Sequence, residues 1–398
     1  MNNSISKYFL IAIAILFSIT LLSFKSALLD IGDQQKKGFY EESFFFPING
    51  GKQTLTGTLA IPEGFNADDK AVILVAPPGA SSRDYSGLYS NLSKELVRNG
   101  IAVLRYDPRH VADTTLAIQS VTMFDQADDA ESAYNALKKD KRFGPIGLLG
   151  HSEGGSSAAI VASRNKNIHF IALLSSPGIS GLDFQLQNTL NNINKTDRFI
   201  KLVDGTEPDT VQNNLLYFHR KRTYSAIANI SNIDSLYSLL KTENKNYREN
   251  VRKYHNTSSG KASMSIKERN EFDSVILLND SLTLLNPRII VLIQYQPELY
   301  YPKISCPVLA VFGKMDEIVF WEENSEGMES LFKKSQKENY EILLLDSINH
   351  EYRKVTDSLS MIMPPGIIQH RKESIGQQNN DFYIPAFSAI AEWINEMK

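Results

Sequence analysis

A short glycine-flanked motif carries the residue best suited to nucleophilic chemistry. Gly150-His151-Ser152-Glu153-Gly154 fits the pattern G-x-S-x-G, with the apolar run PIGLLG before it and GSSAAIVASRN after it. In this pattern a strand precedes the serine and a helix follows, so that the hydroxyl stands on a sharp, strained turn. The flanking glycines fit such a turn, because Cβ atoms would clash with neighbouring backbone. The motif therefore predicts Ser152 as a nucleophile. A glycine-rich nucleotide-binding turn is the alternative, but no G-x-G-x-x-G or G-K-[ST] motif occurs.

A serine hydroxyl needs a base to take its proton and a third group to orient that base. In enzymes that hold the serine on this type of turn, the acid and then the histidine follow it along the chain. Asp316 comes just after the apolar run PVLAVFG. Of the seven histidines, His350 follows the next apolar run, YEILLLDS. We predict His350 as the base and Asp316 as the acid.

Two other carboxylates are alternatives for the acid. Glu317 is the neighbour of Asp316, and Asp346 is close in sequence to His350. Asp316 itself could instead form an Asx turn or cap a helix, which is a common role for aspartate. The order and spacing of the motifs favour Asp316 over both alternatives.

Two backbone N–H groups are expected to hold the oxyanion that forms when the serine attacks. One belongs to Glu153, the residue after the nucleophile. The other is expected from the loop Pro77-Pro78-Gly79-Ala80-Ser81 after the strand AVILVA. Prolines carry no N–H, so we predict Ala80 as the second donor, with Gly79 as the alternative. The other interpretation of PPGASS is a plain loop.

The apolar runs that carry these residues alternate with helix-like segments. Between residues 70 and 176 the order is strand, helix, strand, helix, strand, helix, strand, which is typical of a mostly parallel sheet with helices on both faces. An antiparallel hairpin precedes it, since SFFFPI and QTLTGTLAIP are joined by Asn-Gly-Gly. Loops at the carboxyl ends of parallel strands converge on one edge of the sheet, which is where Ser152, Asp316 and His350 are expected to meet.

Residues 179–300 interrupt this alternation. They are rich in Asn, Lys, Ser and Thr and contain the helix-like patches IDSLYSLLKT and IKERNEFDSVILLNDS. The first apolar strand of core type after them is RIIVLIQY, residues 288–295. Because Leu, Ile, Phe and Tyr recur through the segment, we predict a largely helical cap rather than a disordered insertion. It separates two parts of one core, residues 38–178 and 301–398.

The N-terminus differs from the rest of the chain. Residues 8–24 form an uncharged apolar stretch, long for a signal peptide and slightly short for a membrane span, and no good small-x-small cleavage site follows. Residues 1–28 are therefore interpreted as a cleaved signal or an uncleaved membrane anchor. Either interpretation exports the remainder across the cytoplasmic membrane, into the periplasm or onto the outer side of that membrane.

Charge and cysteine content exclude several functions. The 398 residues carry a formal net charge of −3 and no basic arm, so nothing favours nucleic-acid binding. Cys306, the one cysteine, allows neither an internal disulfide nor a metal-binding cysteine pattern. Its apolar neighbours predict a buried strand residue.

With these residues placed, the sequence resembles the α/β-hydrolase superfamily, and most of all its serine-aminopeptidase-like and acyl-esterase branch. The resemblance covers residues 38–178 and 301–398 and rests on GHSEGG, GIAVLRYDPRHVADTT, SSRDYSG, GKMDEIV and INHEY. It departs where Pro78-Gly79 stands for His-Gly or Ser-Gly, and where His110-Val111-Ala112 replaces Gly-x-Gly. The insertion matches no motif. The resemblance implies an α/β-hydrolase fold with no metal or organic cofactor.

The function expected on this basis is hydrolysis of a small acyl ester through an acyl-enzyme. A serine aminopeptidase is one alternative, and it would need carboxylates in the insertion to hold the substrate's amine; candidates are Glu207, Asp209 and Glu243. A thioesterase would use the same triad. The least favoured alternative is a non-catalytic binding protein on this scaffold, because such proteins usually lose a member of the triad.

Overall fold

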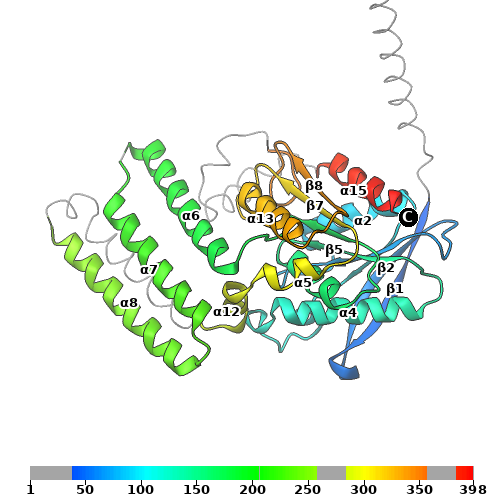
Figure 1. The fold of residues 1–398 in the computed structure, drawn as a ribbon, viewed down its shortest axis with the longest axis horizontal. Helices are drawn as coiled ribbons and strands as arrows, with labels where there is room; N and C mark the ends of the chain where they lie inside the picture. Colours follow the sequence, from blue (N-terminus) through cyan, green and yellow to red (C-terminus); the bar gives the residue numbers. More distant parts are fainter. Residues whose placement is uncertain (1–37, 206, 258–283, 356–381, 398) are drawn as a thin grey trace, which may run out of the picture.

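The computed structural model describes residues 38–205, 207–257, 284–355 and 382–397. Within them, an eight-stranded sheet has the order β1-β2-β4-β3-β5-β6-β7-β8 (Figure 1). Strands β3 to β8 run parallel, whereas β2 is antiparallel to both β1 and β4. The mostly parallel sheet with an N-terminal antiparallel hairpin is confirmed. The strands are β1 (Phe39–Ile48), β2 (Gln53–Pro62), β3 (Ala71–Val75), β4 (Ala102–Tyr106), β5 (Ile146–His151), β6 (Ile171–Leu174), β7 (Val308–Gly313) and β8 (Tyr340–Leu345).

Helices cover both faces of the sheet because its strands are apolar on both sides. Along β3, Ile73 and Val75 pack in one apolar cluster with α4, α5 and α13, whereas Val72 and Leu74 pack in a second cluster with α2 and α15. Every residue of β3 is buried, as expected for a parallel strand covered on two sides. The helices are α2 (Leu88–Arg98), α4 (Met123–Lys139), α5 (Glu153–Arg164), α13 (Trp321–Lys334) and α15 (Ile384–Glu396).

Local sequence signals set the helix ends. At the start of α4, the Thr122 side chain accepts a hydrogen bond from the Asp125 N–H while the Asp125 carboxylate accepts one from the Thr122 N–H, which is a capping box. Lys138 and Lys139 stand in its last turn, where cations stabilise the helix dipole. The described residues also contain the short α-helix α3 (Arg109–Ala112) and the 3₁₀ helices η1 (Asn49–Gly51), η2 (Tyr85–Gly87), η3 (Ile118–Ser120), η4 (Pro297–Leu299) and η5 (Tyr301–Lys303).

Four described helices lie between β6 and β7, and we call them the helical insertion. They are α6 (Gly181–Asp204), α7 (Thr210–Asn229), α8 (Ile233–His255) and α12 (Pro287–Gln294). Side chains of Ser180, Asp209, Asn232 and Asn286 cap their N-termini. In Figure 1, α6, α7 and α8 stand to one side of the sheet, with α12 between them and the core. The expected patch IKERNEFDSVILLNDS lies outside the described residues.

The expectation that RIIVLIQY forms a core strand is wrong, because residues 287–294 form helix α12. The Asn286 side chain accepts a hydrogen bond from the Ile289 N–H, and Pro287 occupies the first turn, where its missing N–H costs nothing. Ile293 is buried while most of the helix is half-buried, so α12 covers the core from one side. An apolar run of this length does not by itself distinguish a buried strand from a short helix.

The apolar stretch 8–24 lies outside the described residues, so export across a membrane stays a prediction. Among the residues that are described, no helix has both the length and the apolar character needed to span a bilayer. Cys306 is buried just before β7.

Candidate active site

Ser152 occupies a strained turn between β5 and α5. Its backbone angles are φ 56° and ψ −129°, a conformation that costs a residue with a side chain about 1–3 kcal/mol. Neighbouring groups hold the turn in place, since the Ser152 N–H donates to the Leu174 carbonyl at 2.8 Å and the Gly155 N–H donates to the Ser152 carbonyl at 2.9 Å. Strain that the surroundings maintain in this way is a feature of functional sites.

The glycines around Ser152 are required by close backbone approach. A Cβ on Gly150 would lie 2.3 Å from the carbonyl oxygen of Gly154, and a Cβ on Gly154 would lie 2.2 Å from the carbonyl oxygen of Val75. Neither carbonyl belongs to a flexible side chain, so the backbone itself would have to move. The steric reason given for the motif therefore holds at both positions.

We expect Gly154→Ala to lower the free energy of unfolding by about 3 kcal/mol or more, because the clash displaces β3 from α5. Urea denaturation measures this change. Gly38→Ala is the matched control, since its Cβ would meet only the carboxylate end of the Glu63 side chain, which can rotate away. Equal stability of the two variants would show that the elbow tolerates a side chain at position 154.

Asp316 and His350 meet where β7 and β8 end. The His350 Nδ1–H donates to Asp316 Oδ2 at 2.8 Å, and the N–H groups of Ile318 and Val319 each donate to Asp316 Oδ1 at 2.9 Å. Burial alone would raise the pKa of Asp316, but the facing imidazole and these hydrogen bonds hold it below its usual value. The carboxylate is therefore ionised at neutral pH and orients the imidazole.

His151 links the histidine loop to the elbow. Its Nε2 lies 2.8 Å from the His350 carbonyl oxygen, and the two imidazole rings are 4.7 Å apart between centroids. Burial lowers the pKa of His151 to about 3, so the ring is neutral and donates its Nε2–H to that carbonyl. His350 is thus held beside the residue that precedes Ser152. In the described part of the chain the Ser152 hydroxyl makes no hydrogen bond, and serine–histidine bonds often tighten only with substrate bound.

The two alternative acids point elsewhere. The Asp346 side chain is 83% exposed and pairs with Lys314 Nζ at 2.8 Å. The Glu317 carboxylate pairs with Lys195 Nζ, on α6 of the insertion, at 2.5 Å. Of the three carboxylates considered, Asp316 is therefore the one that the fold brings to His350.

The expected oxyanion donors differ in availability. The Glu153 N–H is at the first position of α5, where a helix offers no acceptor. The Ala80 N–H donates to the Pro77 carbonyl at 3.0 Å and Ala80 is fully buried, whereas Gly79 is exposed. This geometry favours Gly79, the alternative, over Ala80, because Ala80 would have to break a turn to reach a substrate.

Two insertion residues that the sequence analysis did not identify contact this edge of the core. Arg288 Nη2 on α12 donates to Glu153 Oε2 at 3.1 Å, and Lys195 binds Glu317 as described above. Each cation pairs with the residue directly after a candidate catalytic residue. Arg288 was detectable as the lone charge in the apolar run NPRIIVLIQY, but Lys195 lies in a polar segment with no such signal.

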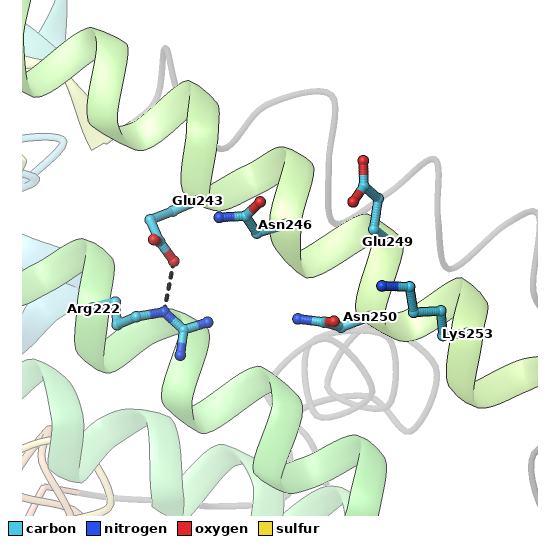
Figure 2. Close-up of a pocket in the computed structure, with 6 residues that line it drawn as sticks. All are labelled: Arg222, Glu243, Asn246, Glu249, Asn250 and Lys253. Carbon is cyan, nitrogen blue, oxygen red and sulfur yellow. Dashed lines mark hydrogen bonds and ion pairs between the residues drawn. The ribbon is translucent and has the colours of Figure 1, made fainter.

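The three carboxylates proposed to bind a substrate amine already have partners. Glu207 pairs with Lys201 at 2.8 Å and Glu243 pairs with Arg222 at 2.6 Å. Asp209 caps α7 and accepts a hydrogen bond from the Tyr254 hydroxyl at 2.9 Å. The Glu243–Arg222 pair borders a polar recess between α7 and α8 (Figure 2), on the part of the insertion that stands away from the sheet (Figure 1). The structure therefore does not bring these carboxylates to Ser152.

The described residues were also considered for a metal site. No group of three or more His, Cys, Asp or Glu side chains among them is arranged to hold a metal ion.

A second recess, beside α7, is lined by Val211, Asn214, Leu215, Phe218, Arg222 and Asn250. Like the recess in Figure 2, it lies among the helices of the insertion.

Part of the chain is similar to known hydrolases. Residues 68–207 match the family model described as serine aminopeptidase, S33. Esterase EstD of Thermotoga maritima is 31% identical over 127 residues, and this alignment spans 30% of the chain and 29% of EstD. Among solved structures, a Pyrococcus furiosus esterase has a TM-score of 0.46 at 15% identity over 90% of this chain and 91% of that chain. For Est1E of Butyrivibrio proteoclasticus the TM-score is 0.44 at 14% identity, over 84% and 99% of the two chains.

The family match covers strands β3 to β6, the glycine-flanked serine and the loop after β3. The sheet order continues the same arrangement through β7 and β8, where Asp316 and His350 follow in the expected sequence. The chain therefore has the α/β-hydrolase fold that its sequence predicts, and residues 68–207 are similar to the serine aminopeptidase S33 family.

Proposed function

We propose that this protein is a serine hydrolase that cleaves carboxylic esters through an acyl-enzyme intermediate. The observation that carries the proposal is the hydrogen-bonded Asp316–His350 pair, held by His151 against the strained turn of Ser152. A nucleophile, a base and an orienting acid at one edge of a sheet are the parts that acyl transfer requires.

In the first half of the reaction, the Ser152 hydroxyl attacks the carbonyl carbon of the ester. His350 takes the hydroxyl proton on Nε2, because its Nδ1–H is committed to Asp316. The carbonyl oxygen becomes an oxyanion that accepts hydrogen bonds from the N–H groups of Glu153 and Gly79, and one such donor is worth about 3 kcal/mol. The imidazolium then protonates the leaving alcohol, and the acyl group stays on Ser152.

In the second half, water replaces the alcohol. His350 accepts a proton from water as the oxygen attacks the acyl carbonyl, and it returns that proton to Ser152 Oγ when the intermediate collapses. The products are the carboxylic acid and the free enzyme. Asp316 remains ionised throughout and stabilises the imidazolium in both halves.

An aminopeptidase activity is the second candidate, because the matching family model carries that description. Against it, Glu207, Asp209 and Glu243 are occupied within the insertion. An ester needs no receptor for a substrate ammonium group, and EstD, which aligns with part of this chain, is named an esterase. These observations favour esters over N-terminal peptides; a thioester would use the same triad.

A serine-directed fluorophosphonate probe tests the proposal. We expect the probe to label the protein and Ser152→Ala to abolish labelling, while Ser163→Ala, on the same helix, labels normally. Parallel assays on short p-nitrophenyl esters and aminoacyl p-nitroanilides then separate the two candidates. Turnover of the anilides alone would refute the ester proposal, and a folded protein without labelling would favour a binding role.

We also propose that the helical insertion serves as a cap that limits substrate size. Two contacts support this role, Arg288 with Glu153 and Lys195 with Glu317, because both join the insertion to residues beside Ser152 and Asp316. We further propose that the apolar stretch 8–24 directs export, so that the enzyme meets its substrate on the outer side of the cytoplasmic membrane.

A further inference from the structure

Arg288 reaches from the insertion to both sides of the expected oxyanion position. Its Nη2 donates to Glu153 Oε2 at 3.1 Å, and its Nη1 lies 3.2 Å from where a Cβ on Gly79 would be. Glu153 and Gly79 are the residues whose N–H groups are proposed to hold the carbonyl oxygen of the substrate. The guanidinium therefore borders the expected position of the carbonyl oxygen, an atom of the acyl group, which stays on Ser152 after the alcohol has left.

The hydrogen-bonding capacity of this pair is largely unused. A guanidinium has five N–H donors, and the structure gives Arg288 one hydrogen bond, to Glu153. Arg288 Nε and Glu153 Oε1 are both buried without a partner. Buried polar atoms are usually satisfied, so an unpaired donor beside a candidate active site is available to a ligand that enters the site.

Arg109 shows how this fold satisfies an arginine with a structural role. Its guanidinium makes four hydrogen bonds, two to the Asp129 carboxylate, one to the Asp125 carboxylate and one to the Asp125 carbonyl. Both arginines lie close to carboxylates, but Arg288 retains free donors and Arg109 retains few. The contrast argues that Arg288 is not placed only to join the insertion to the core.

The positive charge of Arg288 also acts on groups at the start of three different helical elements, α5, α3 and η2. Burial raises the pKa of Glu153 and Arg288 opposes that rise. Burial lowers the pKa of His110, and Arg288 lowers it further. Burial and Glu351 raise the pKa of Tyr85, and Arg288 opposes them. An anion placed among these three elements would thus be attracted by Arg288.

We propose that Arg288 determines specificity by binding a carboxylate on the acyl part of the substrate. The preferred substrates would be half-esters of dicarboxylic acids, whose free carboxylate meets the unpaired Nε–H and the remaining Nη–H groups. Guanidinium and carboxylate match each other in planar, two-bond geometry. This inference rests on the proposed ester hydrolysis and narrows its substrate class.

The test compares a matched pair of esters, mono-4-nitrophenyl adipate and 4-nitrophenyl hexanoate, with Ser152→Ala as the blank for spontaneous hydrolysis. The readout is the ratio of kcat/KM for adipate to that for hexanoate, because a general loss of activity cancels in it. We expect the wild-type ratio to exceed one and Arg288→Gln to lower it about 10- to 100-fold, mainly through KM.

Glu153→Gln separates a substrate role from a structural link. It keeps the Glu153 backbone N–H but removes the carboxylate that competes for Arg288, so the ratio should rise about threefold or more. A structural link predicts that Arg288→Gln and Glu153→Gln act alike on both esters. Arg288→Lys keeps the charge without the planar fork and should retain part of the preference; it also keeps the test open if Arg288→Gln folds poorly.

Each remaining outcome has a definite meaning. Ser152-dependent turnover of hexanoate, with a ratio that Arg288→Gln does not change, overturns the inference and leaves the ester hydrolase standing. The inference is also overturned if Arg288→Gln lowers kcat/KM equally for both esters, since Arg288 would then act on the oxyanion or on the cap. Absence of Ser152-dependent turnover of either ester overturns the proposed function together with the inference.

Discussion

Replacing either Ser152 or His350 with alanine should reduce kcat by about 10⁴-fold or more, and replacing both should cost little beyond the larger single loss. Ser152 supplies the attacking oxygen and His350 the base that activates it, so removal of either leaves the other without a role. Steady-state kinetics on a short p-nitrophenyl ester, with all three variants at equal concentration, measures the effect.

The matched controls are Ser163→Ala and His169→Ala. Ser163 lies on α5 beyond the elbow, and the exposed His169 lies two residues before β6, at the amino ends of the parallel strands and so away from Ser152. Both should keep wild-type activity within about threefold. Independent losses that multiply in the double variant, or near-normal turnover in His350→Ala, would contradict the assignment of a cooperating pair.

The core of this site could be predicted from sequence because each candidate residue follows an apolar strand within a few residues. Strands β5 and β7 are buried throughout, and β8, at the edge of the sheet, is half-buried. An apolar run indicates the strand, and the alternation of strands and helices indicates a parallel sheet, so the carboxyl ends of the strands and the residues that follow them lie at one common side. Ser152, Asp316 and His350 follow β5, β7 and β8 in this way. The approach of His350 to Asp316, and to His151 just before Ser152, is thus a consequence of topology more than of the loops themselves.

Contacts between the insertion and the core could not be predicted in the same way. The apolar run of α12 predicted a strand, because the run is too short for its hydrophobic periodicity to distinguish a strand from a helix. With the run assigned to a core strand, Arg288 was not considered as a residue of the site. The choice between Ala80 and Gly79 depended on a single turn hydrogen bond, from Ala80 to Pro77. Long-range pairs and individual backbone bonds leave no periodic trace in one sequence.

Asp316→Asn should lower kcat/KM by about 10⁴-fold while the protein remains folded. The asparagine amide can donate to His350 Nδ1, which would place the ring proton on Nε2, the nitrogen that must accept the proton from Ser152. The imidazolium that forms during attack would also lose the facing negative charge. Kinetics on the same ester, with a thermal melting curve for each variant, distinguishes this chemical loss from unfolding.

Asp346→Asn is the matched control, because it makes the same chemical change on the carboxylate that the sequence offered as an alternative acid partner of His350. The Asp346 side chain is exposed and paired with Lys314, and exposed ion pairs contribute at most about 1 kcal/mol. Its activity should stay within about threefold of wild type. If Asp346→Asn were the damaging change and Asp316→Asn were mild, the hydrogen bond from His350 to Asp316 would have to be structural, and the histidine loop would have to rearrange before catalysis.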